Sequence, residues 1–104
     1  MKYDLEFLEE ALEDLQESLI WYESKKIGLG QEFYNSVKDS IIRLQEFPKR
    51  SQKILTNVRR FVLKKFPFNI FFIIDEDVYK IKIIAIFHNS RNPYIWQNRI
   101  SGAA

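Results

Sequence analysis

The chain has 104 residues, 16 basic and 14 acidic side chains, a formal net charge of +2 and no cysteine. This length suits one domain with a single hydrophobic core. The lack of cysteine excludes disulfides, thiolate metal ligands and a cysteine nucleophile, and a reducing cytoplasm is the expected location. The acidic start is unlike a signal peptide, and no apolar run approaches the ~20 residues of a membrane span, so we expect neither export nor membrane insertion.

The charges are divided unevenly along the chain. Through Phe47 there are eleven acidic and five basic residues, whereas from Pro48 onward there are eleven basic and three acidic ones. The second half therefore either meets an anionic partner, such as nucleic acid or an acidic protein, or is neutralised by the first half within one fold. The sequence leaves both interpretations open.

The chain begins with the pattern of a short strand and then of a helix. Tyr3, Leu5 and Phe7 alternate with polar residues, which is the period of a half-buried strand. From Leu8 to Tyr22 apolar residues recur at steps of three and four and predict an amphipathic helix. The acidic residues between them, with no histidine interleaved, predict a solvated helix face and not a metal site. They are Glu9, Glu10, Glu13, Asp14 and Glu17.

A second helix is predicted from Leu29 to Phe47, where Pro48 stops it. The cations and glycines between Lys25 and Gly30 are the residues expected to end the first helix. Two antiparallel helices joined by so short a loop form a hairpin. Its apolar stripes must cover the rest of the chain.

The second half predicts a meander of three strands after a polar linker from Lys49 to Asn57. The strands are runs rich in Ile, Phe and Val, at Val58–Leu63, Phe68–Ile74 and Val78–Phe87. The Phe66-Pro67-Phe68 segment and the acidic turn at 75–77 separate them.

Strict alternation predicts which residues of the last strand share a face. One face would carry Tyr79, Ile81, Ile83, Ala85 and Phe87, and the other, expected to be partly open, would carry Lys80, Lys82, Ile84, Ile86 and His88. The sheet is also rich in aromatic residues, some of which we expect a partner to cover. They are Phe61, Phe66, Phe68, Phe71, Phe72 and Phe87.

At the end of the chain, Asn92 and Pro93 predict the start of a short helix through Trp96 to Arg99, followed by a frayed tail at residues 101–104. The element order β-α-α-β-β-β predicts an α+β fold in two layers. An N-terminal strand and a helical hairpin would pack on an antiparallel sheet in a single domain spanning residues 1–100.

This order, together with several local patterns, resembles the RelE/ParE family of toxins from type II toxin–antitoxin systems. The helical part of the likeness is Ala11, Asp14 and Leu15, then Trp21-Tyr22-Glu23, then Leu29-Gly30 with Gln31 to Phe33. The sheet part is Val58-Arg59-Arg60, Leu63, Phe66-Pro67-Phe68 with Ile70 and Phe72, and Ile81 to His88 followed by Arg91, Pro93 and Trp96. The likeness covers nearly the whole chain and rests on order and spacing.

The resemblance implies a cytoplasmic toxin that inhibits growth, in the manner of plasmid stabilisation systems, unless a cognate antitoxin neutralises it. It implies no cofactor, no metal and no membrane, and contact with operator DNA only through the antitoxin. Such antitoxins wrap the toxin with an extended acidic segment, and a basic, aromatic sheet with an exposed edge suits that binding mode.

The resemblance leaves the target open, because ParE-like members inhibit DNA gyrase without hydrolysis and RelE-like members cut mRNA on the ribosome. Asn69 stands where RNA-cleaving relatives tend to place an arginine, and an amide cannot neutralise a phosphate as a guanidinium does. With the Phe66-Pro67-Phe68 turn, this favours the ParE-like branch. The alternatives are an mRNA interferase and a non-toxic module that only binds antitoxin.

An RNA-cleaving member would need a base, an acid and a cation for the phosphate. The candidates are His88, Arg91, Arg59 and Arg60. Each has a structural interpretation as well: His88 could cap the sheet edge, Arg91 could pair with the acidic hairpin, and Arg59 and Arg60 point to opposite faces, so that at most one joins a site while the other pairs with a helix carboxylate.

A wider set of residues is predicted to bind the antitoxin or the target. It contains Lys64, Lys65, Asn69, Lys80, Lys82, Arg91, Trp96 and Arg99. Trp96, like Trp21 and Tyr22, could instead pack in the core between helix and sheet.

Overall fold

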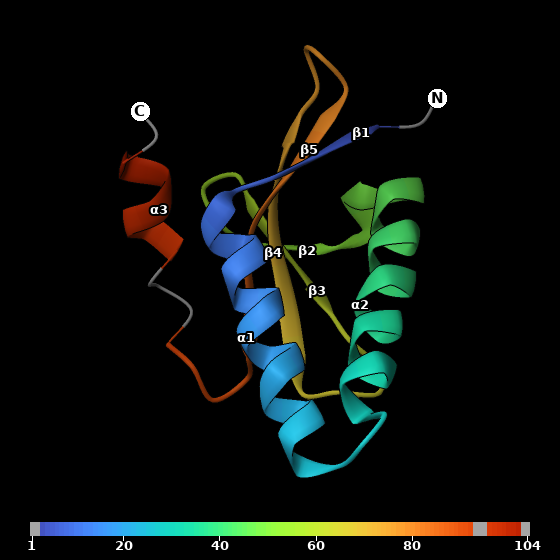
Figure 1. Ribbon diagram of the computed structural model, residues 1–104. Coiled ribbons are helices and arrows are strands. Elements are labelled where there is room, and N and C mark those ends of the chain that lie inside the picture. Colours follow the sequence, from blue (N-terminus) through green and yellow to red (C-terminus); the bar gives the residue numbers. More distant parts are fainter. Residues whose placement is uncertain (1–2, 93–95, 103–104) are drawn as a thin grey trace.

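A strand and a helical hairpin open the chain in the computed structural model, which describes residues 3–92 and 96–102. The elements are β1 (Asp4–Phe7), α1 (Glu9–Lys25) and α2 (Leu29–Glu46). The two helices pack against each other side by side in front of the sheet (Figure 1). The predicted strand and both predicted helices are therefore confirmed.

The turn between the helices depends on two glycines and one carboxylate. Gly28 has a φ of +91°, a left-handed conformation that favours glycine. The Glu23 carboxylate, near the end of α1, accepts hydrogen bonds from the backbone N–H groups of Gly28 and Gly30 at 3.0 to 3.1 Å. These bonds satisfy donors that would otherwise be unpaired at the start of α2.

The sheet has five strands in the order β1-β5-β4-β3-β2. After a short 3-10 turn η1 (Pro48–Arg50) come β2 (Gln52–Leu55), β3 (Val58–Val62), β4 (Phe68–Asp75) and β5 (Lys80–His88). The three predicted strands form the expected antiparallel meander, and the α+β class is confirmed.

Two details of the sheet differ from the prediction. The segment from Lys49 to Asn57, predicted to be a polar linker, contains the edge strand β2, whose mostly exposed residues give it no alternating pattern to detect. The sheet is also not wholly antiparallel, because β1 pairs in parallel with β5 from Asp4 opposite Lys80 to Phe7 opposite Ile83. Between these two strands the chain passes through the helical hairpin and then through β2, β3 and β4, so the first and last strands of the sheet lie side by side.

A β-bulge in β5 changes which residues face the helices. Phe72 lies opposite Ile83, but Phe71 lies opposite Ala85, so Ile84 is an extra residue in the ladder. The predicted faces hold from Lys80 to Ile84 and are wrong from Ala85 on, because the extra residue reverses the alternation, and Tyr79 lies before the strand begins. Ile81, Ile83 and Ile86 join the core beneath the helices, whereas Ile84, Ala85 and Phe87 join a second cluster.

The second cluster lies on the sheet face away from the hairpin, since Phe71 and Phe72 point to opposite faces and Phe72 packs in the helix-side core. It is completed by Trp96 of α3 (Trp96–Gly102). Four of the six aromatic residues of the sheet are buried by the chain itself and need no partner to cover them, namely Phe68, Phe71, Phe72 and Phe87. Phe61 and Phe66 are partly buried.

The final helix lies beside α1 and contacts β5 (Figure 1). It extends past the predicted end at Arg99 through Ser101 and Gly102, which were predicted to fray. The predicted helix start at Pro93 and the terminal residues 103–104 lie outside the described residues.

Candidate functional site

One buried carboxylate joins three elements of the fold. Asp14 of α1 is 6% exposed, and it accepts two hydrogen bonds from the guanidinium of Arg99, at 2.6 and 2.9 Å. It also accepts the backbone N–H of Ile86 at 3.1 Å. Asp14 was predicted to lie on a solvated acidic face, which is wrong. It follows Ala11 by three residues, and this spacing on the apolar stripe is the signal that could have identified it.

The Asp14 site compensates for the short length of β1. Pairing between β1 and β5 ends at Phe7 opposite Ile83, so the edge of β5 beyond that point has no neighbouring strand. Asp14 accepts the N–H of Ile86 there, and Arg99 donates to the carbonyl of Ile84 at 2.9 Å. The hydrogen bond to Asp14 raises the pKa of the Arg99 guanidinium above its ordinary value. Arg99, predicted to bind a partner, is thus engaged within the fold.

Arg91 lies at the rim of the same site. Its guanidinium is 3.7 Å from Oδ1 of Asp14 and 4.3 Å from the centre of the Phe87 ring. This is the predicted structural alternative for Arg91, an ion pair with the acidic hairpin. The same arginine, being 43% exposed, is only partly withdrawn from solvent.

Arg59 and Arg60 lie on opposite faces of β3, as predicted. Arg59 is opposite the helix-side Phe72 and donates to the backbone carbonyls of Lys49 and Ser51, at 3.2 and 2.9 Å. Arg60 is opposite Phe71 and donates to the Gln52 side chain at 2.9 Å. Neither pairs with a helix carboxylate, which corrects that part of the prediction.

His88 ends β5 and is exposed. Its Nδ1 accepts the backbone N–H of Ser90 at 3.0 Å and lies 2.8 Å from the Ser90 hydroxyl, while its ring packs edge-on against Phe68. Asn69, opposite the neighbouring Phe87, donates to the side chain of Asn89 at 2.9 Å.

The four candidate catalytic residues do not converge. Arg59 lies opposite Phe72 and His88 opposite Phe68, a separation of roughly 13 Å along β4 at 3.3 Å per residue. Arg60 is on the other face of the sheet. The structure brings only His88 and Arg91 together, through a backbone hydrogen bond from the N–H of Arg91 to the carbonyl of His88.

The lysines predicted to bind a partner fall into two groups. Lys80 and Lys82 lie 3.5 and 3.3 Å from the Glu6 carboxylate, and the hydrogen bond from Lys82 holds the pKa of Glu6 below its ordinary value. Lys64 and Lys65, in the turn after β3, are exposed and form no ion pair within the described residues.

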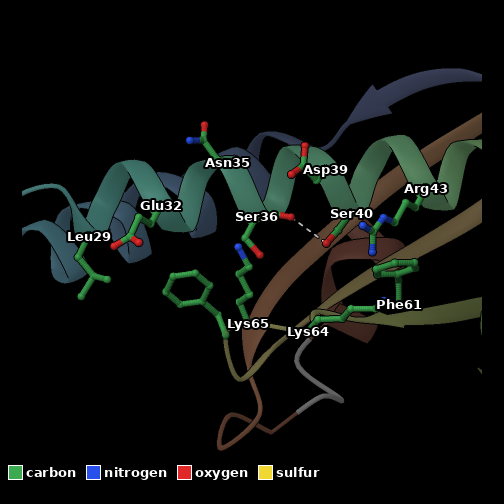
Figure 2. Close-up of a pocket in the computed structure, with 11 residues that line it drawn as sticks. Leu29, Glu32, Asn35, Ser36, Asp39, Ser40, Arg43, Phe61, Lys64 and Lys65 are labelled. Atoms are coloured by element: carbon green, nitrogen blue, oxygen red, sulfur yellow. Dashed lines mark hydrogen bonds between the residues drawn. The ribbon is translucent and has the colours of Figure 1, made fainter.

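Lys64 and Lys65 line a pocket of about 460 Å³ between this turn and α2 (Figure 2). The helix contributes Glu32, Asp39 and Arg43 to the same pocket. Sequence reasoning selected the two lysines but missed Arg43, which lies in the amphipathic pattern of a helix far away in the sequence.

The tryptophans are placed differently from each other. Trp96 is 2% exposed and packs in the second cluster, so it takes the core position that was its alternative interpretation. Trp21 is 55% exposed, with the Lys25 ammonium 4.8 Å from its ring centre, so the core interpretation is wrong for Trp21.

Within residues 3–92 and 96–102 no group of three or more histidine or acidic residues is placed to hold a metal ion. Over the same residues, no helix is long and apolar enough to cross a membrane.

Comparisons with known proteins identify the fold. No protein-family model and no curated protein matches the chain significantly. Among solved structures, a chain of the chromosomal ParDE toxin–antitoxin system of P. aeruginosa matches with a TM-score of 0.70 and 20% identity, covering 84% of this chain and 96% of that one.

Two structures from E. coli agree with this match. A chain of the intact RelBE toxin–antitoxin complex has a TM-score of 0.65 and 15% identity, over 86% of this chain and 99% of that one. A mutant of the toxin RelE in complex with an antitoxin RelBc peptide has a TM-score of 0.63 and 14% identity, over 95% of both chains. The predicted resemblance to the RelE/ParE toxins is confirmed at the level of the fold.

Proposed function

We propose that this chain, which has the fold of the RelE/ParE toxins, is the toxin of a type II toxin–antitoxin pair, neutralised by a cognate antitoxin. The carrying observation is the match over nearly the full length of chains from the ParDE and RelBE systems. The RelE structure with an antitoxin peptide supports an antitoxin as the partner.

Within that family we propose the ParE-like branch, with DNA gyrase as the target. Metal-free RNA cleavage needs a general base, a general acid and a phosphate-binding cation within hydrogen-bond reach of one substrate. Arg59 and Arg60 lie far from His88 and Arg91. Three of the four are also engaged: Arg59 with two carbonyls, Arg91 with Asp14, and His88 with Ser90. This arrangement favours a binding inhibitor over a ribonuclease.

Two assays on the purified protein separate the branches. In the first, gyrase supercoils a relaxed plasmid with increasing protein present; in the second, a translating extract is examined for cleavage of a reporter transcript. We expect supercoiling to be inhibited, with the transcript intact, and addition of the antitoxin to restore supercoiling.

Transcript cleavage with gyrase active would replace this proposal with the mRNA interferase. In that case His88→Ala and Arg91→Ala test whether these residues take part, because cleavage that survives both changes would remove them from the mechanism. Tight antitoxin binding with neither effect would point to a non-toxic binding module.

A further inference from the structure

An exposed tryptophan lies beside a small pocket near the end of α1. Trp21 is 55% exposed, although the other tryptophan of the chain, Trp96, is buried. The pocket has a volume of about 370 Å³ and lies between α1, the start of β4 and the loop after β5. Its lining consists of Glu17, Ser18, Trp21, Tyr22, Phe68, His88 and Ser90. Four of these side chains carry aromatic rings, so the pocket offers ring faces and ring edges to a ligand.

The rings of the pocket hold one another in place. The Tyr22 ring centre lies 5.1 Å from that of Trp21, in an edge-on contact, and 6.0 Å from that of Phe68. The ring of His88 meets Phe68 edge-on at 5.3 Å, and its Nδ1 accepts the N–H of Ser90. The aromatic wall is therefore formed before a ligand arrives, and binding does not have to order it.

The charge of the pocket is negative. Among the described residues that line it, Glu17 has the only carboxylate and there is no lysine or arginine. Glu17 forms no ion pair in the described part of the chain and precedes Trp21 by one helical turn, so the carboxylate and the indole are neighbours. The exposed Glu10 and Glu13 continue the same side of α1 at steps of three and four. Ring faces next to negative charge suit a cationic ligand.

Two contacts within the fold show that its ring faces attract cations. The Lys25 ammonium lies 4.8 Å from the centre of the Trp21 ring, although Lys25 does not line the pocket. Arg99 combines a ring with a carboxylate, because its guanidinium lies 4.9 Å from the centre of the Phe87 ring and donates to Asp14. Trp21 and the Glu17 carboxylate present the same two kinds of group at the surface.

We propose that this pocket binds the guanidinium of an arginine presented by a partner protein. The planar group would stack on the exposed Trp21 ring and donate two hydrogen bonds to the Glu17 carboxylate. Tryptophan and arginine are both frequent among the residues that contribute most to protein interfaces. Nucleic acid fits less well, because the carboxylates of Glu10, Glu13 and Glu17 would repel its phosphates. Neither gyrase inhibition nor antitoxin binding is assumed.

The test is an NMR titration of the full chain, labelled with ¹⁵N, with the peptide acetyl-Gly-Arg-Gly-amide. Shift changes are expected at the indole N–H of Trp21 and at the amides of Ser18 and Ser90. The same peptide with citrulline in place of arginine keeps the planar shape without the charge, and it should bind at least about threefold more weakly. Equal binding of the two peptides, shift changes confined to other residues, or no binding at the solubility limit would overturn the proposal.

Two variants separate the carboxylate from the ring. Glu17→Gln should weaken binding of the arginine peptide about threefold, and Trp21→Leu, which keeps the apolar bulk, should weaken it by at least as much. Glu9→Gln is the matched control, because Glu9 is also exposed on α1 but does not line the pocket, and its affinity should equal that of the unchanged chain. A dispersed amide spectrum checks that each variant is folded. Unchanged affinity in either pocket variant would contradict the proposed contacts.

Two further probes test other occupants of the pocket. Tetramethylammonium represents a free organic cation and adenosine monophosphate represents a nucleotide, and the arginine peptide should bind more tightly than either. Tighter binding of tetramethylammonium would overturn the assignment to arginine in favour of a small organic cation. Tighter binding of adenosine monophosphate would overturn the cationic ligand itself. Gyrase inhibition is measured in its own assay, so the failure of either proposal is distinguishable from the failure of the other.

Discussion

At the residue scale, the Asp14 carboxylate accepts three hydrogen bonds from other elements of the fold. It joins α1 to the unpaired edge of β5 and, through Arg99, to α3. Both members of the pair are largely withdrawn from water, with side chains 6% and 11% exposed. Breaking a buried pair by removing one charge is strongly destabilising, because the other charge remains without compensation.

Asp14→Asn is therefore expected to lower the free energy of unfolding by about 3 kcal/mol. Urea unfolding measures the loss, with Glu13→Gln as the control because Glu13 is the exposed neighbour on the same helix. We expect less than about 0.5 kcal/mol for that control, as for most surface substitutions. Equal losses in the two variants would mean that the ion pair contributes nothing beyond an ordinary surface charge.

At the scale of elements, the helical hairpin depends on a close approach at Gly30. A Cβ added there would lie 2.8 Å from the backbone carbonyl oxygen of Leu19, closer than van der Waals contact allows. At Gly28 an added Cβ would meet nothing within 4 Å, but the φ of +91° would remain strained. A side chain at Gly30 would therefore clash with the neighbouring helix, whereas a side chain at Gly28 would strain only the backbone.

Gly30→Ala is expected to destabilise the protein by about 2 to 3 kcal/mol, since neither helix can move without disturbing the hairpin. Gly28→Ala should cost only about 1 kcal/mol. Thermal or urea unfolding of both variants ranks them. A larger loss at Gly28 than at Gly30 would contradict the close contact between the helices.

The elements that the sequence predicts are those with a regular period. Both helices follow from apolar spacing and the three central strands from runs rich in Ile, Phe and Val, and the β-α-α-β-β-β order led to the correct class. The bulge at Ile84 could not be predicted, because an apolar residue inserted in an apolar run leaves no mark on the pattern. Beyond the bulge, Ile86 lies beneath the helices and donates its N–H to Asp14. The pattern of the strand carried no sign of this contact, although the position of Asp14 on the apolar stripe of α1 was a sign on the side of the helix.

The candidate site was predicted less well than the fold, for a related reason. Sequence identified cationic residues but not their partners, which lie far away along the chain. Arg99 pairs with Asp14 across 85 positions and Lys80 with Glu6 across 74. Arg91 is the exception, because an ion pair between it and a carboxylate of the acidic hairpin was one of the two alternatives that the sequence left open.

At the scale of the whole molecule, the uneven charge of the chain is partly neutralised within the fold. Arg91 and Arg99 meet Asp14, and Lys80 and Lys82 meet Glu6, which is the internal neutralisation that the sequence allowed. Lys64 and Lys65 remain without carboxylate partners in the described residues. Internal neutralisation therefore holds for those four cations, and an anionic partner for the remaining ones stays a prediction.

The central claim is that the protein is a toxin, and induction in growing cells tests it most directly. Expression from a tightly repressed promoter should arrest growth and reduce colony counts, and co-expression of the adjacent reading frame should restore both. Undiminished growth, with the folded protein detected in the cells and no neighbour present, would contradict the proposed function.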